Sequence, residues 1–86
     1  MIYDANVDDS NIFSGTIYDV CVIGAGAAGI TIANELGKAG KKIALCEAGA
    51  AEFSKESQEN YKGEVTGDPY FDLDVARLRF LGGTTN

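Results

Sequence analysis

The amino-acid sequence predicts an α/β fold in which two parallel strands are joined by one helix. Two short apolar runs, residues 18–23 and 42–47, flank a stretch at 27–39 in which apolar residues recur at helical spacing. Apolar runs without polar alternation are typical of strands buried on both faces, as in parallel sheets. The order strand, helix, strand within about thirty residues is a βαβ unit, for which a right-handed crossover is expected.

Each predicted element has its own local signals. The first strand ends at Gly24, which closes a β-branched run. The helix carries Ile30 and Leu36 on one face, and Gly40 behind it is a typical C-terminal cap. Two lysines then lead into the second strand, which ends at Glu47.

The rest of the chain gives weaker signals. Residues 1–16 are polar and acidic, and we expect an acidic leader with little regular structure. Residues 52–62 form either a short helix starting near Ser54 or a loop, and residues 67–69 mark a turn. Apolar and charged residues alternate over 70–81, which predicts an extended, half-buried segment.

Composition excludes several classes of function. The chain has 86 residues, with 7 Lys and Arg against 13 Asp and Glu, a net charge of −6. It therefore lacks the basic face that nucleic acid or an anionic membrane requires, and we expect it to bind neither. No run is long enough to span a bilayer, and the start has no signal-peptide pattern, so a cytoplasmic location is expected.

Side chains suited to catalysis or metal binding are scarce. There is no histidine, which removes the commonest general base and the commonest metal ligand. Cys21 and Cys46 lie in the two apolar runs, at a spacing that matches no redox or zinc motif, and we expect both to be inert, buried hydrophobes. We predict no catalytic residue and no metal site in this chain.

The predicted elements leave one face of the sheet without cover. Two strands buried on both faces need a layer above and a layer below, and one helix supplies only one of these layers. We therefore expect an incomplete unit, either the N-terminal piece of a longer chain or a chain docked on another subunit.

A Gly-x-Gly-x-x-Gly motif joins the first strand to the helix. Gly24 allows the tight turn, Gly26 lets a diphosphate approach the backbone, and Gly29 permits close packing of helix on strand. The diphosphate would bind to free N–H groups at the start of the helix. With a strand before it and a helix after it, the motif predicts a Rossmann-like dinucleotide site, whereas the alternative is a glycine turn that only packs.

Glu47 supplies the second part of this pattern. It stands 23 residues after Gly24, at the end of the second strand, where a carboxylate accepts hydrogen bonds from the hydroxyls of an adenosine ribose. It would repel a 2′-phosphate, which disfavours NADP. The alternative is a solvated acid at the strand end, and these features do not separate NAD from FAD.

Three segments resemble the N-terminal FAD-binding region of the glucose–methanol–choline (GMC) oxidoreductases. They are the strand and glycine motif at 18–29, Leu-Cys-Glu-Ala-Gly at 45–49, and Arg-Phe-Leu-Gly-Gly-Thr-Thr-Asn at 79–86. The last is the most specific. The resemblance covers residues 17–86, is greatest to the bacterial sugar, polyol and gluconate dehydrogenase branch, and implies that this range is the N-terminal part of an FAD-binding domain.

The resemblance implies a role for particular residues. The glycine motif would line the FAD diphosphate, and Glu47 and Ala48 would hold the ribose. Residues 82–84 would form a second loop against the diphosphate and the flavin side, and Asn86 would approach the flavin ring. Gly82 and Gly83 could present consecutive N–H groups as an anion nest or form a plain turn. Arg79 could neutralise phosphate charge or pair with Asp72 or Asp74. The cofactor-binding residues so implied are Gly24, Gly26, Ala27, Ala28, Gly29, Glu47, Ala48, Arg79, Gly82, Gly83, Thr84 and Asn86.

The resemblance also implies an activity. In that family the flavin accepts a hydride from an alcohol or sugar carbon, while a histidine near the C-terminus removes the hydroxyl proton. These 86 residues have no histidine, so alone they are expected to be inactive and to need the remainder of their own chain as partner. The alternatives are the N-terminal unit of another flavoprotein with two dinucleotide sites, a reductase or amine oxidase, and a stand-alone nucleotide-binding module.

Overall fold

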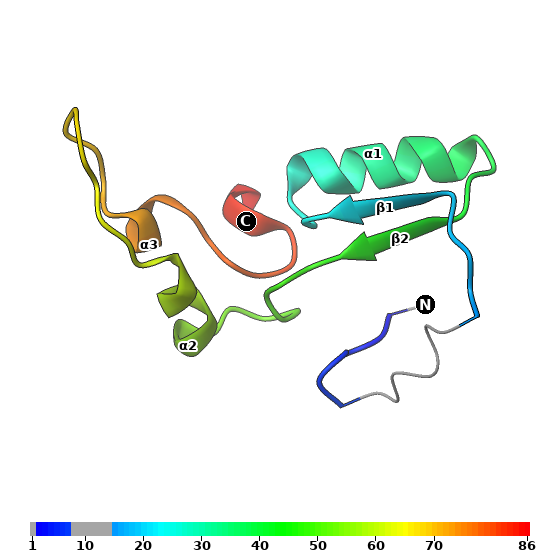
Figure 1. Cartoon of the computed structure of the whole chain (residues 1–86), viewed down its shortest axis with the longest axis horizontal. Coiled ribbons are helices and arrows are strands. Elements are labelled where there is room, and N and C mark those ends of the chain that lie inside the picture. The colour runs from blue at the N-terminus through cyan, green and yellow to red at the C-terminus, as the bar shows by residue number, and fades with distance from the viewer. Residues whose placement is uncertain (1, 8–14) are drawn as a thin grey trace.

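A computed structural model describes residues 2–7 and 15–86 of the chain. Of the leader predicted over 1–16, residues 1 and 8–14 lie outside the described part. Figure 1 shows the elements in chain order, which are β1 (Val20–Ile23), α1 (Ala27–Lys38), β2 (Ile43–Cys46), α2 (Lys55–Gln58), η2 (Glu59–Tyr61), α3 (Leu73–Ala76) and η3 (Gly83–Thr85).

The first half of the chain is the βαβ unit that the sequence predicts. β1 and β2 pair in parallel, from Val20 beside Ile43 to Ile23 beside Cys46, and α1 connects them and lies along one face of the pair (Figure 1). Both strands are shorter than predicted. At their start the Asp19 carboxylate accepts the Lys42 N–H at 2.7 Å, while the Asp19 N–H donates to the Lys42 carbonyl at 2.8 Å, so a side chain supplies one of the acceptors there.

The glycine that the sequence predicts at the end of α1 does end the helix, although the last helical residue is Lys38 and not residue 39. Ala39 is the C-cap, and Gly40 adopts a positive φ of 81°. The Gly40 N–H donates to the Gly37 carbonyl at 3.0 Å and the Lys41 N–H to the Leu36 carbonyl at 3.0 Å. This is the Schellman pair of hydrogen bonds, which turns the chain back toward β2.

We expect Gly40→Ala to lower the free energy of unfolding by about 1 kcal/mol, because a Cβ disfavours the left-handed conformation. Gly40→Asn should lose clearly less, since asparagine tolerates that conformation. Urea denaturation of both variants beside the wild type measures the difference. Equal stability of the alanine variant and the wild type would contradict this assignment.

The expectation that both strands are buried on both faces is wrong for this structure. Ala25 is the one buried apolar residue in the described part of the chain, and Ile23 is 88% exposed. α1 covers the face that carries Val22, which a Cβ on Gly29 would touch at 3.4 Å. Successive strand residues point to opposite faces, so Cys21 and Ile23 lie on the face that α1 does not cover.

Both cysteines are exposed, which corrects the expectation that they are buried. Cys21 and Cys46 share the uncovered face, and their sulfur atoms lie 3.9 Å apart, within hydrogen-bonding range. Partial burial raises the pKa of the Cys46 thiol, and the contact with Cys21 adds to the rise. The raised pKa makes the thiolate, which is the nucleophilic form, less populated.

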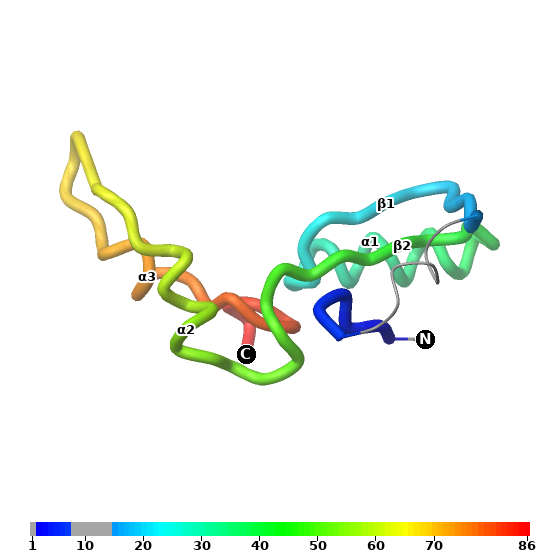
Figure 2. Tube along the Cα trace, turned by 60° about the horizontal axis from the view of Figure 1, so that its bottom comes forward, coloured from blue at the N-terminus to red at the C-terminus, as the bar shows by residue number. Residues whose placement is uncertain are grey.

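The second half of the chain consists of short helical turns linked by loops. Ser54 caps α2 by accepting the Ser57 N–H at 3.1 Å, which confirms a helix starting near Ser54. The turn at 67–69 is also present, with Gly67 at a φ of 84°. Figures 1 and 2 show the loop around this turn projecting away from the βαβ unit.

The prediction of an extended segment over 70–81 is wrong for α3. The Asp72 carbonyl accepts the N–H groups of Val75 and Ala76, at 3.0 and 2.9 Å, which closes one helical turn. Arg77, directly after α3, has an extended backbone. Within residues 2–7 and 15–86, no helix is long and apolar enough to cross a membrane.

Candidate cofactor-binding site

The glycine-rich turn between β1 and α1 has the geometry that its three glycines predict. Gly24 has a φ of 102°, and its N–H donates to the Cys46 carbonyl at 2.7 Å, which ties the turn to the end of β2. A Cβ on Gly29 would overlap the Gly24 carbonyl oxygen, so only glycine lets α1 approach β1 this closely. A Cβ on Gly26 would meet no atom within 4 Å, so the side of Gly26 on which a side chain would stand is open to a ligand.

The start of α1 offers backbone donors to an anion. Gly26 is the N-cap, and the first helical hydrogen bond runs from the Ile30 N–H to the Gly26 carbonyl at 2.9 Å. The N–H groups of Ala27 and Ala28 therefore have no acceptor within the helix. No side chain in the described part of the chain caps α1, and its first turn holds no acid. Such a helix start favours a bound phosphate.

The Glu47 carboxylate lies directly beside this turn. Its Oε2 accepts the Ala25 N–H at 2.8 Å, and its Oε1 accepts the Gly49 N–H at 2.7 Å. The side chain is half-buried, and these two bonds fix its direction. A carboxylate has about four acceptor sites, so each oxygen still has one for a ribose hydroxyl. The ribose contact itself stays a prediction.

The 81–86 segment packs against the glycine-rich turn, although more than fifty residues separate them in sequence. The Gly82 N–H donates to the Ala25 carbonyl at 2.8 Å. A Cβ on Gly83 would lie 3.4 Å from the Gly26 Cα. Figure 1 shows this C-terminal segment beside the start of α1. Three separate parts of the chain, around Ala25, Glu47 and Gly82, thus meet at one place.

The expected anion nest at Gly82 and Gly83 is wrong. Both glycines have positive φ, 91° and 62°, and both N–H groups are already used, by the Ala25 carbonyl and by the Phe80 carbonyl, each at 2.8 Å. The Gly82 bond joins the 81–86 segment, called the second loop below, to the glycine-rich turn, and the Gly83 bond lies within the C-terminal segment itself. Neither N–H is free to bind an anion. The alternative, a turn, describes the pair correctly.

Thr84 and Asn86 also stabilise the second loop. The Thr84 hydroxyl accepts the Leu78 N–H at 3.1 Å. The Asn86 amide donates to the carbonyls of Leu81 and Gly83, at 2.9 and 3.0 Å. Contacts of Thr84, Asn86 and Ala48 with a cofactor stay predictions.

Arg79 is bound to α2. Its Nη1 donates to the Ser57 hydroxyl at 2.5 Å and to the Ser57 carbonyl at 3.4 Å. The expected alternative, an ion pair with Asp72 or Asp74, is wrong, because in the described part of the chain the ion pairs are Glu35–Lys38 and Glu59–Lys62. The phosphate role of Arg79 stays a prediction.

Two residues of this region were given no role by the sequence alone. A Cβ on Gly49 would overlap the Arg79 carbonyl oxygen, so Gly49 allows the segment after Arg79 to cross β2's end. Gly49 ends the Leu-Cys-Glu-Ala-Gly segment at 45–49, and a glycine at the end of such a segment could have indicated a close approach of another part of the chain. Gln58 is buried and bonds to the 74–79 segment, and no pattern in the sequence marks it.

A groove of about 1130 Å³ opens beside the carboxylate. Ala25, Glu47, Ala48 and Leu81 contribute to its wall, and residues 2–6 line it as well. Its volume is sufficient for the nucleoside part of a dinucleotide. No group of three or more His, Cys, Asp or Glu within the described residues is placed to hold a metal ion.

Two parallel strands, a connecting helix, an open glycine-rich turn and a carboxylate at the end of the second strand define a partial Rossmann-like unit for binding a dinucleotide. Residues 19–78 match the family model described as FAD dependent oxidoreductase (DAO), so the chain belongs to that family and its cofactor is FAD. No curated protein and no solved structure matches the chain.

Proposed function

We propose that this chain is the FAD-binding region of an oxidoreductase that oxidises a CH–OH group of an alcohol or a sugar, as in the GMC oxidoreductases. The observation that carries the proposal is the 81–86 segment. Its sequence, Leu-Gly-Gly-Thr-Thr-Asn, lies outside the 19–78 match and packs on the glycine-rich turn through the Gly82–Ala25 hydrogen bond. This position supports a second loop beside the cofactor.

In this proposal the backbone at the start of α1 binds the diphosphate of FAD. Ala27 and Ala28 donate their N–H groups to it, and the open side of Gly26 lets the diphosphate approach. The positive end of the helix dipole favours the negative charge. The guanidinium of Arg79 adds a positive charge to the region around the diphosphate. Its hydrogen bond to the Ser57 hydroxyl attaches this charge to α2.

Glu47 binds the adenosine ribose. The two hydrogen bonds from Ala25 and Gly49 direct the carboxylate, so that its remaining acceptor sites are held in position before the cofactor arrives. The same negative charge repels a 2′-phosphate, and this makes the site selective for an adenosine without one.

The bound flavin supplies the hydride-accepting chemistry. The residues of this chain bind and orient it, and we assign none of them to proton transfer, since the sequence contains no histidine. We propose that the proton acceptor and the substrate contacts come from outside these 86 residues, and that the protein acts in the cytoplasm on a small-molecule alcohol or sugar.

The experiment is anaerobic reduction of the flavin in the protein as its host produces it. A polyol or sugar should bleach the visible absorption of the flavin, whereas NADH or an amine should not. Bleaching by NADH alone would indicate a reductase, and bleaching by an amine alone would indicate an amine oxidase. Either result would contradict the proposed substrate class and leave the FAD site intact.

A further inference from the structure

We propose that Gln58 is a positioning residue for the FAD site, which it serves by fixing the 79–83 segment against the glycine-rich turn. This proposal rests on the proposed function. Gln58 lies on α2 and is 8% exposed, and among the described residues it is the one polar residue that is buried. A buried amide must have its hydrogen-bonding groups satisfied, and the partners of Gln58 show what it holds.

The Gln58 side chain binds the backbone of a distant segment at three points. Its Nε2 donates to the Asp74 carbonyl at 2.6 Å and to the Arg77 carbonyl. Its Oε1 accepts the Arg79 N–H at 2.9 Å. Both donors and the acceptor are used, and turning the amide over would place its oxygen against two carbonyls. Only glutamine in this orientation satisfies all three partners.

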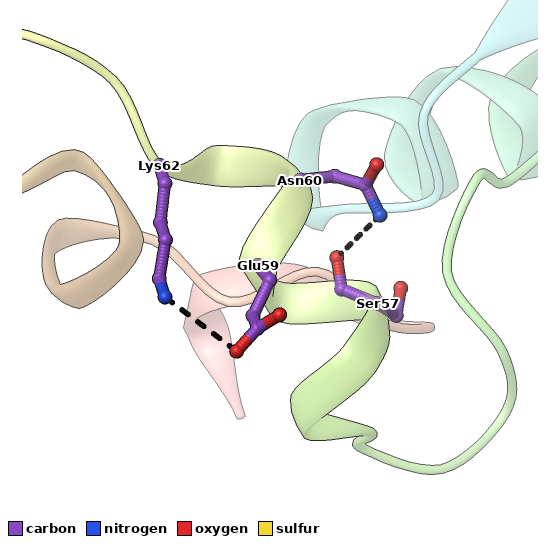
Figure 3. A network of polar contacts seen from close by, with 4 residues as sticks. All are labelled: Ser57, Glu59, Asn60 and Lys62. Carbon is purple, nitrogen blue, oxygen red and sulfur yellow. Dashed lines mark hydrogen bonds and ion pairs between the residues drawn. The ribbon is translucent and has the colours of Figure 1, made fainter.

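The neighbouring residue on α2 holds the same point of the chain. Ser57 accepts the Arg79 guanidinium through its hydroxyl and its carbonyl. Figure 3 shows that the Ser57 carbonyl also accepts the Asn60 amide, at 3.0 Å, beside the exposed Glu59–Lys62 pair. Arg79 is thus bound at its backbone by Gln58 and at its side chain by Ser57.

The segment reaches the cofactor site within three residues of this attachment. The Arg79 carbonyl packs on Gly49, the Leu81 N–H donates to the Ala50 carbonyl at 2.9 Å, and the Gly82 N–H donates to the Ala25 carbonyl at 2.8 Å. Phe80 meets Phe53 edge to face, with ring centroids 6.0 Å apart. Gln58 therefore fixes where the second loop meets the first, without lying at the FAD site itself.

The test uses Gln58→Glu, because its effect should depend on pH. Above the pKa of the introduced carboxyl, a negative charge faces two carbonyl oxygens and both donors are lost. Burial raises that pKa, so acidification protonates the carboxyl and restores one donor. We expect the Kd for FAD to rise about tenfold at about pH 8 and to return to within about threefold of the wild type at about pH 5.

Asn34→Asp is the matched control. It makes the same change from amide to carboxylate at an exposed position on α1, which takes no part in the contacts of Gln58, Ser57 and Arg79. Its Kd for FAD should follow the wild type at every pH. Gln58→Met, which lacks all three hydrogen bonds and any charge, should weaken FAD binding without the recovery on acidification.

Amide hydrogen exchange without cofactor provides an independent measurement. In Gln58→Glu at about pH 8, protection of the Leu81 and Gly82 amides should fall about tenfold, while β1 and β2 amides keep theirs. Unchanged protection at Leu81 and Gly82, or a Kd for FAD equal to the wild type at both pH values, overturns the role of Gln58. Failure of the wild-type protein to bind FAD would instead overturn the proposed function.

Discussion

Gly29→Ala is expected to destabilise the βαβ unit by about 3 kcal/mol or more, and FAD binding should be lost with it. The reason is a backbone collision. The added Cβ would overlap the Gly24 carbonyl oxygen and approach the Gly24 carbonyl carbon at 3.0 Å, and neither atom can move as a side-chain end can. Relief requires α1 to shift away from β1, and this shift would also displace the N–H groups of Ala27 and Ala28.

Gly37→Ala is the matched control for this substitution. Gly37 lies on the same helix, and a Cβ there would meet no atom within 4 Å. Alanine should therefore stabilise the protein by about 0.5–1 kcal/mol, because it lowers the conformational entropy of the unfolded chain. Urea denaturation followed by circular dichroism gives both free energies. If Gly29→Ala unfolded at the wild-type urea concentration, the close packing of helix on strand would be refuted.

Glu47→Ala should raise the Kd for FAD about 100-fold, since hydrogen bonds to a charged acceptor contribute about 1.5–3 kcal/mol each. The substitution removes both proposed ribose contacts. It also releases the N–H groups of Ala25 and Gly49, which loosens the turn that receives the diphosphate. Titration of the protein with FAD, followed by flavin fluorescence, measures the change.

Two further variants separate these effects. Glu47→Gln keeps one carbonyl acceptor and should lose about tenfold in affinity. Glu52→Ala removes an exposed acid that lies five residues further on, and it should bind FAD as the wild type does. FAD affinity that stayed unchanged in Glu47→Ala would remove this carboxylate from the site.

The βαβ unit could be predicted from the sequence because its signals are local. Gly24 and Gly40 adopt positive φ, and Gly29 allows α1 to approach β1 closely. The apolar runs between these glycines mark the strands and the helix. Burial could not be predicted in the same way. An apolar run indicates which residues prefer to be covered, and Cys21 and Ile23 lie on a face that α1 does not cover.

The candidate site was predictable in part for the same reason. The glycine motif and Glu47 are spaced as the two halves of a dinucleotide site. In the structure a hydrogen bond from the Ala25 N–H to the Glu47 carboxylate joins them. The partners of Arg79 and Gln58 were not predictable, because they depend on contacts between segments about twenty residues apart. No local pattern distinguishes an arginine that binds phosphate from one that binds a serine on a neighbouring helix.

The backbone of Ala25 has a consequence for anyone who wishes to transplant this site into another scaffold. Its N–H is bound by Glu47 and its carbonyl by the Gly82 N–H, and it is the most deeply enclosed apolar residue of the described chain. A graft of the six-residue glycine motif alone would leave both of these groups without partners. The smallest transferable module therefore comprises three discontinuous pieces, which have to be installed together.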